Sequence, residues 1–374
     1  MNSPTERTWA EVWPEKLVSN MRAIRASLPE GTKFLGVVKA DAYGHGAVPV
    51  ARALADGGAD YLAVACLEEA LELRGADIRL PILILGNTPP EDVPLLLEND
   101  ITQTAADAAY AAAYSAAACA AGGTLRVHIK ADTGMSRLGF LCDEAHLDES
   151  AEAIRRVCAL PGLRAEGIFT HFAVSDEPDS DSVSYTKRQF ARFSAVIRAL
   201  GGQGIRFALC HCAATGGTLF YPEFALDMVR PGLLLYGYGD AAGKLRLQPG
   251  MALKSRISAV KHYPAGTRIS YGGTYTTQRE TRMGVIPVGY ADGLHRTLSN
   301  KARFWTKDGF APQRGRICMD MCMIDLTELP GVGVGDEVEI FGPNADLEAL
   351  AALAGTIPYE LLCAVSPRVP RVYL

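Results

Sequence analysis

Lys39 stands where a continuous apolar run ends and a loop of small residues begins. Residues 34–38 (Phe-Leu-Gly-Val-Val) predict a strand that is buried on both faces, and residues 47–56 predict a helix. The loop between them adds an aromatic hydroxyl at Tyr43 and two glycines. At the C-terminal end of a parallel strand, the Lys39 amine would face the opening in which barrel enzymes keep their chemistry. The alternative is a lysine that only caps the strand at the rim, because a single lysine is a weak signal.

Further basic side chains stand at or just behind the ends of later predicted strands. They are Lys130, His171, His211 and Arg230, followed in loops by Arg137 and Thr215. Arg230 lies in the apolar run 228–236, where a guanidinium needs a partner, either a carboxylate or a cofactor heteroatom. Lys130 and Arg137 would repel each other unless an anion lies between them. A structural salt-bridge network explains that pair as readily as a binding site does.

The C-terminal third carries Tyr271 on a Ser-Tyr-Gly-Gly turn at 270–273. Taken alone, such a tyrosine is usually an ordinary surface residue. Residues 316–321 (Arg-Ile-Cys-Met-Asp-Met) predict part of a buried strand. The glycines at 331, 333 and 335 lead into a strand rather than a helix, so they predict a turn and not a phosphate loop.

The composition argues against several classes of function. Lys and Arg number 37 against 42 Asp and Glu, a net charge of −5 without a basic tract, so neither nucleic acid nor a membrane is an expected partner. No signal segment or membrane span is predicted, and the expected location is cytoplasmic. The 9 cysteines include no CxxC pair and predict reduced thiols. The segment 210–212 (Cys-His-Cys) is not expected to bind a metal, because neighbouring strand residues point to opposite faces.

A regular alternation of strand and helix signals would position these residues. Strands are predicted at 34–38, 60–66, 80–86, 101–104, 125–130, 165–171, 206–212 and 228–236. Helices are predicted at 14–28, 47–56, 67–74, 90–98, 106–121, 144–158, 183–199 and 215–220. Eight such units predict an α/β fold with an N-terminal (β/α)8 TIM barrel. A doubly wound sheet is the alternative, but no GxGxxG follows the first strand.

From about residue 246 the pattern changes to strands joined by tight turns. Strands are predicted at 251–263, 281–290, 301–307, 311–326 and 335–342, with a helix at 346–354 and an extended tail. The expected domains are therefore a barrel over 1–245 and a mostly β C-terminal domain over 246–374. Residues 1–12, with a leading strand at 7–12, are a candidate to pair with the β domain.

These motifs together closely resemble one known family, the bacterial alanine racemases, which are fold type III pyridoxal-phosphate enzymes. The segment Val38-Lys39-Ala-Asp-Ala-Tyr43-Gly-His-Gly resembles the family's cofactor-lysine motif, and the resemblance covers essentially the full length. The other matches, in family order, are Lys130-Ala-Asp-Thr-Gly-Met-Ser-Arg137-Leu-Gly, Thr170-His171-Phe-Ala, His211-Cys-Ala-Ala-Thr215, Met228-Val-Arg230-Pro-Gly232, Ser270-Tyr271-Gly, Gly289-Tyr-Ala-Asp-Gly293, Gly315-Arg-Ile-Cys-Met319-Asp320 and Pro358-Tyr359-Glu. The combination of the lysine motif with the tyrosine motif is highly specific.

The resemblance implies that Lys39 holds pyridoxal 5'-phosphate as a Schiff base. It implies that the other cofactor-binding residues are Tyr43, Arg137, His171, Thr215, Arg230, Gly232, Leu233 and Tyr359. Hydroxyl groups and the amides near Gly232 and Leu233 would bind the phosphate, and Arg230 would face the pyridine nitrogen. Family members commonly have serine at the Thr215 position, but threonine keeps the hydroxyl.

The resemblance also implies a head-to-tail homodimer with shared active sites. Tyr271, Met319 and Asp320 would then come from the partner subunit's β domain. Met319 would offer its backbone N–H to the substrate carboxylate, and Arg137 would also contact substrate. Lys130 matches a position that is often carbamylated, and the added carboxylate would remove its repulsion with Arg137. No metal is implied.

The implied reaction is the interconversion of L-alanine and D-alanine, which supplies D-alanine for cell-wall peptidoglycan. The cofactor would accept the charge left when Cα loses its proton. Lys39 would handle the proton of the D antipode and Tyr271 that of the L antipode. His171 would link Arg230 to Tyr271 by hydrogen bonds and so favour the ionised hydroxyl. The permanent charge of Arg230 would keep the ring nitrogen unprotonated and suppress transamination.

Three rival functions remain to be weighed. The first is another pyridoxal enzyme on this scaffold, either a serine or broad-specificity racemase or a basic amino-acid decarboxylase. Tyr359 and the full Tyr271 motif favour alanine, because a bulky tyrosine leaves room for little beyond a methyl group. The second is a non-catalytic pyridoxal-binding protein, which the second domain argues against. The third is a metal-dependent barrel hydrolase, for which the sequence has no convergent set of carboxylates and histidines.

Overall fold

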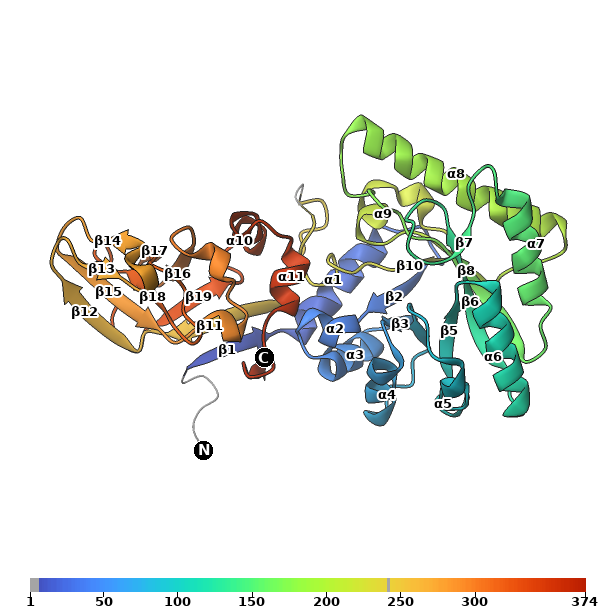
Figure 1. Ribbon diagram of the computed structural model, residues 1–374, viewed down its shortest axis with the longest axis horizontal. Helices are drawn as coiled ribbons and strands as arrows, with labels where there is room; N and C mark the ends of the chain where they lie inside the picture. Colours follow the sequence, from blue (N-terminus) through green and yellow to red (C-terminus); the bar gives the residue numbers. More distant parts are fainter. Residues whose placement is uncertain (1–6, 241–242) are drawn as a thin grey trace.

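The computed structural model describes residues 7–240 and 243–374 as two bodies side by side (Figure 1). One is a ring of parallel strands enclosed by helices, and the other is a mostly antiparallel sheet with two short helices. Within the described residues, no helix is long and apolar enough to cross a membrane. Both bodies share one hydrophobic core cluster, which runs from Ala10 to Val369.

The first body confirms the predicted α/β barrel. Its strands are β2 (Lys33–Val37), β3 (Tyr61–Val64), β4 (Ile82–Ile84), β5 (Ile101–Ala105), β6 (Leu125–Asp132), β8 (Leu163–Phe169), β9 (Leu209–His211) and β10 (Met228–Val229). They pair in parallel in the order β10-β2-β3-β4-β5-β6-β8-β9, and β7 (Phe140–Leu141) pairs with β6. The barrel is nearly closed, because the Asp227 and Arg230 amides donate to carbonyls beside β9 at 3.1 and 2.8 Å.

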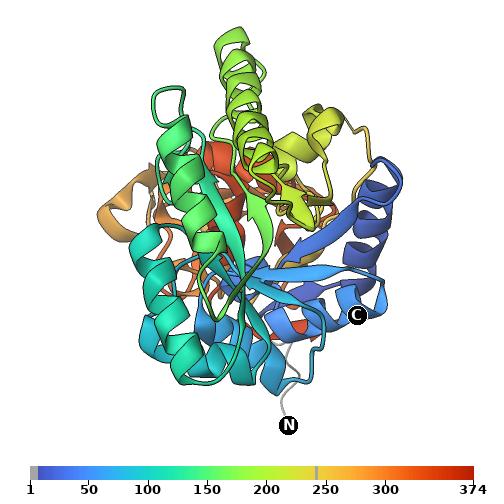
Figure 2. The ribbon, with the colours of Figure 1, turned by 90° about the vertical axis from the view of Figure 1, so that its right-hand side faces the viewer.

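Helices cover the outside of this ring, as the view along its axis shows (Figure 2). They are α1 (Pro14–Ala26), α3 (Ala47–Asp56), α4 (Leu67–Gly75), α5 (Val93–Glu98), α6 (Ala108–Ala120), α7 (Leu147–Cys158), α8 (Ser180–Gly202) and α9 (Thr215–Phe220). Short 3-10 turns lie at Pro90–Asp92 and Pro222–Phe224. Apolar residues repeat along one face of α1, where Leu17, Met21 and Ile24 are buried.

The predicted strand at 228–236 is wrong beyond its second residue. Pro231 has no N–H to give to a ladder, and the next residues form turns instead. The amides of Leu235 and Gly237 donate to the carbonyls of Gly232 and Leu234 at 2.9 and 3.0 Å. Because β10 ends early, Gly232 lies in the turn after the strand, and its backbone lines a cavity at this end of the barrel.

The second body is one sheet in the order β12-β15-β18-β17-β16-β19-β11-β1-β20. Its strands are β1 (Thr8–Val12), β11 (Met251–Arg256), β12 (Ala259–Tyr263), β15 (Thr281–Ile286), β16 (Arg303–Thr306), β17 (Gly309–Arg314), β18 (Cys322–Asp325), β19 (Glu337–Phe341) and β20 (Arg371–Tyr373). A separate hairpin joins β13 (Arg268–Ile269) to β14 (Tyr275–Thr276). The remaining elements are α10 (Leu347–Ala354), α11 (Pro358–Cys363) and 3-10 turns at Tyr271–Gly273, Tyr290–Asp292 and Arg296–Leu298.

The leading strand belongs to the second body, although it comes first in the chain. β1 pairs antiparallel with β11 and parallel with β20, so it lies between the two (Figure 1). Residues 1–6 of the segment expected to pair there lie outside the described residues.

Two predicted strands of this body are each divided, and one helix was missed. The run 251–263 breaks at residues 257–258 into β11 and β12, which lie at different places in the sheet. The run 311–326 ends at Arg314, and residues 315–321 form a loop, exposed at 319–321, before β18 begins. Helix α11 was not predicted, although Pro358 at its first position is a typical helix start.

Candidate active site

A cavity of about 670 Å³ opens at the C-terminal ends of the barrel strands. It is lined by most of the sequence-predicted residues of the barrel, namely Lys39, Tyr43, Lys130, Arg137, His171, Thr215, Arg230 and Gly232, and by Tyr359 of α11 in the β-rich body. Leu233 is buried and does not line it. None of the described lining residues is an aspartate or glutamate, so the cavity is electropositive and suited to an anion.

Lys39 begins a short turn of unusual backbone conformation, α2 (Lys39–Tyr43), directly after β2. Residues 40–43 have φ between 51° and 53°, the left-handed region that costs side-chain-bearing residues about 1–2 kcal/mol each. Glu69 accepts a hydrogen bond from the Ala40 amide at 2.7 Å, and Asp41 accepts one from the Ala47 amide at 2.7 Å. These bonds hold a strained loop that aims Tyr43 into the cavity, a typical feature of functional sites.

The cavity lowers the proton affinity of its two lysines. Burial, followed by the charge of Arg137, lowers the pKa of Lys39. Burial and then Arg230 lower the pKa of Lys130 to about 7, against the opposing effect of Asp132. Lys130 can therefore be neutral, and nucleophilic or basic, near neutral pH, and Lys39 loses its proton more readily than an ordinary lysine.

Arg230 is buried at the end of β10 and is held from three sides. Its guanidinium donates to the Thr170 and Cys212 carbonyls at 2.8 and 3.3 Å and to His211 Nδ1 at 2.7 Å. The Phe169 ring lies 5.3 Å from the Arg230 guanidinium carbon and stacks on the His211 ring with centroids 4.9 Å apart. Burial lowers the pKa of Arg230 to about 10, which leaves the group charged at neutral pH.

A chain of hydrogen bonds leads from Arg230 into the barrel interior. Because Arg230 can only donate, His211 accepts at Nδ1 and carries its proton on Nε2, which lies 2.9 Å from His128 Nδ1. His128 in turn carries its proton on Nε2, 3.5 Å from a Glu166 carboxylate oxygen. The pKa of Glu166 is lowered to about 2, chiefly by His128 and also by the Tyr61 hydroxyl at 2.7 Å.

Sequence reasoning missed His128, Glu166 and Phe169. The available signal was a polar side chain within an apolar strand, since His128 lies in the Leu-Arg-Val-His-Ile-Lys run of β6. A buried polar group of this kind usually has a partner on a neighbouring strand, and β8, which carries Glu166, pairs with β6.

The side of the cavity near Gly232 forms a cradle of small and hydroxyl-bearing groups. The Gly232 amide lies 3.2 Å from Thr215 Oγ1, and a Cβ at Gly232 would come within 2.8 Å of the Tyr43 hydroxyl. The rings of Tyr43 and Tyr359 lie with centroids 5.6 Å apart. Burial raises the pKa of both hydroxyls, so both remain hydrogen-bond donors. Donors without a bulky side chain between them suit a phosphate group.

His171 lies in this cavity, but its ring has no hydrogen-bond partner within the described residues. Burial and then the charge of Arg230 hold its pKa well below the ordinary value, so the ring is neutral. The predicted hydrogen-bonded link from Arg230 through His171 to Tyr271 stays a prediction.

Tyr271, Met319 and Asp320 lie in the β-rich body, where they share a groove of about 550 Å³. Tyr271 is 68% exposed and Met319 is 53% exposed, unusual fractions for large apolar side chains. Ser270 ties the two segments together, because its hydroxyl donates to the Arg316 carbonyl at 2.7 Å. The strand predicted at 316–321 is therefore wrong at this point, since the segment is a loop that presents Met319 outward. The chain does not bring these residues into its own barrel cavity.

The whole chain matches known proteins. Residues 13–240 match the family "Alanine racemase, N-terminal domain", and residues 250–373 match "Alanine racemase, C-terminal domain". A protein named alanine racemase from Desulfovibrio desulfuricans is 46% identical over 370 residues, covering 98% of both chains. One of the same name from Desulforamulus reducens is 47% identical over 374 residues, covering 99% of both.

Solved structures agree with this match over both bodies. Alanine racemase from Clostridium difficile 630 has a TM-score of 0.91 at 39% identity, covering 100% of this chain and 96% of that one. The enzyme from Bartonella henselae, solved with covalently bound pyridoxal phosphate, has a TM-score of 0.88 at 27% identity, covering 98% and 99%. With both halves of the family matched in order and relatives above 40% identity, this chain belongs to the alanine racemase family.

Proposed function

We propose that this protein is a pyridoxal 5'-phosphate-dependent racemase that interconverts L-alanine and D-alanine. The observation that carries the proposal is the barrel cavity, in which Lys39, with its lowered pKa, faces an electropositive space beside the hydroxyl cradle at Gly232. Membership of the alanine racemase family supports the same reaction.

The residues present fit this cofactor. The phosphate would be bound by the hydroxyls of Tyr43, Thr215 and Tyr359 and by the amides of Gly232 and Leu233, where the cradle leaves no room for a side chain. Lys39 would form the covalent bond to the cofactor. Arg230 would donate to the ring nitrogen and His171 and Arg137 would contact the cofactor's remaining edge. When bound, the cofactor supplies a conjugated ring that takes up the charge left on Cα after deprotonation.

The reaction needs two bases, one on each face of Cα. Lys39 accepts and returns the proton of the D antipode, and its lowered pKa suits that role near neutral pH. Tyr271 of the partner subunit acts on the L antipode. The Met319 N–H of the partner subunit and Arg137 bind the substrate carboxylate, with Asp320 supporting the Met319 loop.

Two copies of the chain are required for this arrangement. Tyr271 and Met319 are exposed in a groove of the β-rich body, and the cavity that holds Lys39 lies in the barrel. A head-to-tail homodimer would place the groove of each copy over the barrel of the other. The proposed domain boundary between residues 245 and 246 separates the barrel, which carries Lys39, from the β-rich part, which carries Tyr271 and Met319.

Lys130 is proposed to carry a carbamate. An amine with a pKa of about 7 is roughly half neutral at neutral pH and can add carbon dioxide. Addition of carbon dioxide to the neutral amine would release one proton and replace the lysine's positive charge with a carboxylate, which would offset the charges of Arg137 and Arg230.

We assign the enzyme to the supply of D-alanine for cell-wall peptidoglycan, in the cytoplasm. All 9 cysteines are free in the structure, which suits a reducing compartment. The partners are a second copy of the chain and a small amino acid.

The test is reconstitution with pyridoxal 5'-phosphate, followed by absorbance spectroscopy and a chiral assay. A cofactor band that Lys39→Ala removes, together with formation of D-alanine from L-alanine, is the expected result. Equal turnover of L-serine would favour a broad-specificity racemase on the same fold. A cofactor band without any D-amino acid would show a binding protein and overturn the proposal.

A further inference from the structure

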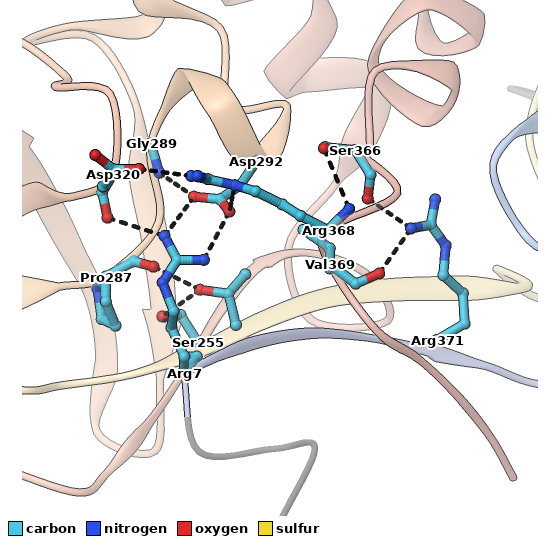
Figure 3. A network of polar contacts seen from close by, with 11 residues as sticks. Arg7, Ser255, Pro287, Gly289, Asp292, Asp320, Ser366, Arg368, Val369 and Arg371 are labelled. Carbon is cyan, nitrogen blue, oxygen red and sulfur yellow. Dashed lines mark hydrogen bonds and ion pairs between the residues drawn. The ribbon is translucent and has the colours of Figure 1, made fainter.

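A buried carboxylate in the β-rich body, Asp292, joins the two ends of the described chain (Figure 3). It accepts two hydrogen bonds from Arg7 at 2.7 and 3.0 Å, one from Arg368 Nε at 2.8 Å and one from the Gly289 amide at 2.9 Å. Its side chain is 0% exposed, whereas the two arginines are 41% and 40% exposed. Arg7 directly precedes β1 and Arg368 lies just before β20. Burial alone would raise the pKa of Asp292, but the hydrogen bonds from Arg7 and Arg368 hold it below its ordinary value.

The same two arginines reach the loop that presents Met319. Arg368 Nη2 lies 2.9 Å from the Asp320 carboxylate, and Arg7 Nη2 donates to the Asp320 carbonyl at 3.2 Å (Figure 3). Asp320 therefore meets both arginines from the surface, Arg368 through its carboxylate and Arg7 through its backbone carbonyl, and completes a set of two cations and two anions. Pairs of this kind fix direction as well as charge, because a guanidinium offers donors in a planar fork.

Every backbone carbonyl along the loop from Cys318 to Asp320 has a donor. The Tyr290 and Ala291 amides donate to the carbonyls of Cys318 and Met319 at 3.1 and 3.0 Å. Arg7 holds the third carbonyl, that of Asp320. A Cβ at Gly289 would collide with the first two carbonyls, so the segment that carries Asp292 packs directly on the loop.

The Met319 N–H is the exception. Within the described residues it has no hydrogen-bond partner, and its side chain is exposed in the groove shared with Tyr271. A loop whose carbonyls are all fixed while one exposed amide stays free is organised to donate that amide to something outside the chain.

We propose that Arg7, Asp292 and Arg368 form a positioning clamp that sets the direction of the Met319 N–H toward the substrate carboxylate. The proposal rests on the proposed function, in which that amide acts in the partner subunit's site. None of the three clamp residues touches substrate. Arg7 and Arg368, which lie near the two ends of the described chain, therefore contribute to the affinity for alanine. They act through the loop at 318–320, from which both are distant in the sequence.

Arg368→Ala and Arg7→Ala each remove one arginine of the clamp. A third variant, Arg368→Lys, keeps the positive charge but lacks the planar guanidinium with its several donors. We expect KM to rise about tenfold for L-alanine and D-alanine alike, because both antipodes present the same carboxylate, while kcat changes less than about twofold. The cofactor absorbance band should stay unchanged. Arg368→Lys should recover part of the affinity, since one ammonium can reach Asp292 or Asp320 but cannot bridge them.

The matched control is Arg279→Ala, which removes another arginine–carboxylate pair of the same body, Arg279 with Glu328, neither of which lines the groove. A second readout does not depend on turnover: amide hydrogen exchange over 318–321 should be faster in Arg368→Ala than in wild type or the control. A KM within twofold of wild type, or unchanged exchange, overturns the clamp whatever happens to the melting temperature. A wild-type protein that does not racemise alanine would instead overturn the proposed function, so the two failures are distinguishable.

Discussion

Tyr271 can be tested as a base by following each antipode separately. In Tyr271→Phe the ring remains but the hydroxyl that would take the proton of L-alanine is lost. Racemisation should fall by about a hundredfold or more, and deuterium from solvent should still enter D-alanine through Lys39 while it no longer enters L-alanine. The measurement is mass spectrometry of each antipode after incubation in deuterium oxide.

A tyrosine in the same groove, Tyr263, provides the control. Tyr263→Phe should leave exchange in both antipodes near wild type. Equal loss of exchange in L- and D-alanine for Tyr271→Phe would contradict the two-base assignment. The Tyr271 hydroxyl would then either act on both faces of Cα or have only a structural role.

Lys130 is the second residue with a direct chemical test. Its pKa of about 7 leaves roughly half of the amine neutral at neutral pH, so carbon dioxide can add to it. Isotope-labelled bicarbonate should give a carbamate signal in the NMR spectrum that is absent in Lys130→Met, and this variant should bind alanine less tightly because Arg137 loses its partner. Lys254, which forms an ion pair with Glu11 at 2.8 Å, is the control, and Lys254→Met should keep the signal. A signal that survives Lys130→Met would assign the carbamate elsewhere.

Residue type and spacing were enough to find most of the polar side chains of the barrel cavity, whereas Gly232 and Tyr359 were predicted only from the family resemblance. Lys39, Lys130 and Arg230 stand at or near the C-terminal ends of apolar strands. Because parallel strands end on the same side of a barrel, the sequence alone predicts that these three side chains lie close together. The partners Phe169, His128 and Glu166 were not predicted, because which residues of neighbouring strands face each other depends on register. Between β6 and β8 the register shifts at Val127 and His128, and a sequence pattern cannot show such a shift.

At the scale of elements, barrel strands were easier to predict than their ends. A strand buried on both faces is a continuous apolar run, whereas 228–236 remains apolar after Pro231 has already ended the ladder. The apolar residues in 311–326 also predicted one continuous strand, although a loop interrupts it. Met319 and Met321 in that loop are 53% and 45% exposed. Both wrong strand predictions fall where a loop contributes residues to the candidate site. At such functional positions the backbone conformation often departs from what the local sequence pattern predicts.

Hydrogen bonds join Arg230, His211 and His128 across β9 and β6, and the contact of 3.5 Å from His128 to Glu166 on β8 predicts a pH-dependent stability. The pKa of Glu166 is lowered in the folded state, to about 2, so its contribution is complete above the ordinary value of 4.5 and is lost as the pH falls through about 2. Glu166→Gln should therefore lower the free energy of unfolding by roughly 1–3 kcal/mol above pH 5, and the difference should shrink as the pH falls toward 3. Urea unfolding at several pH values measures it.

Glu152 supplies the comparison for this element-level effect. Its pKa is also lowered to about 2, by Arg155 and Arg156, but the group lies on the surface of α7, where solvent weakens the pairs. Glu152→Gln should cost clearly less stability than Glu166→Gln. A difference between wild type and Glu166→Gln that is independent of pH would show that Glu166 acts by packing alone.

At the scale of the whole molecule, the proposed site draws residues from both bodies. The barrel cavity carries Lys39, and the groove of the β-rich body carries Tyr271 and Met319. The antiparallel body also takes its first strand from the start of the chain, since β1 pairs with β11. The clamp at Asp292 continues this arrangement, because it ties residue 7 and residue 368 to the loop of the groove.

Mixing two inactive variants tests whether the halves meet between subunits. Lys39→Ala keeps Tyr271, and Tyr271→Phe keeps Lys39, so each homodimer contains two incomplete sites. In a head-to-tail mixed dimer, one site combines Ala at position 39 with Phe at 271, and the other combines the intact lysine with the intact tyrosine. Random reassociation makes half of the dimers mixed, so the mixture should recover about a quarter of wild-type activity.

The recovered activity should rise with time after mixing, as subunits exchange, and should keep the wild-type KM, because the restored site is complete. Mixing Lys39→Ala with Arg230→Ala is the matched control: both changes lie in the same barrel cavity, so no mixed dimer can bring an intact lysine and an intact arginine together. Activity in the control mixture would show that the site is not divided as proposed. Failure of the first mixture to recover activity, with subunit exchange verified by mass spectrometry, would place Tyr271 and Lys39 of one chain in the same site and contradict the head-to-tail dimer.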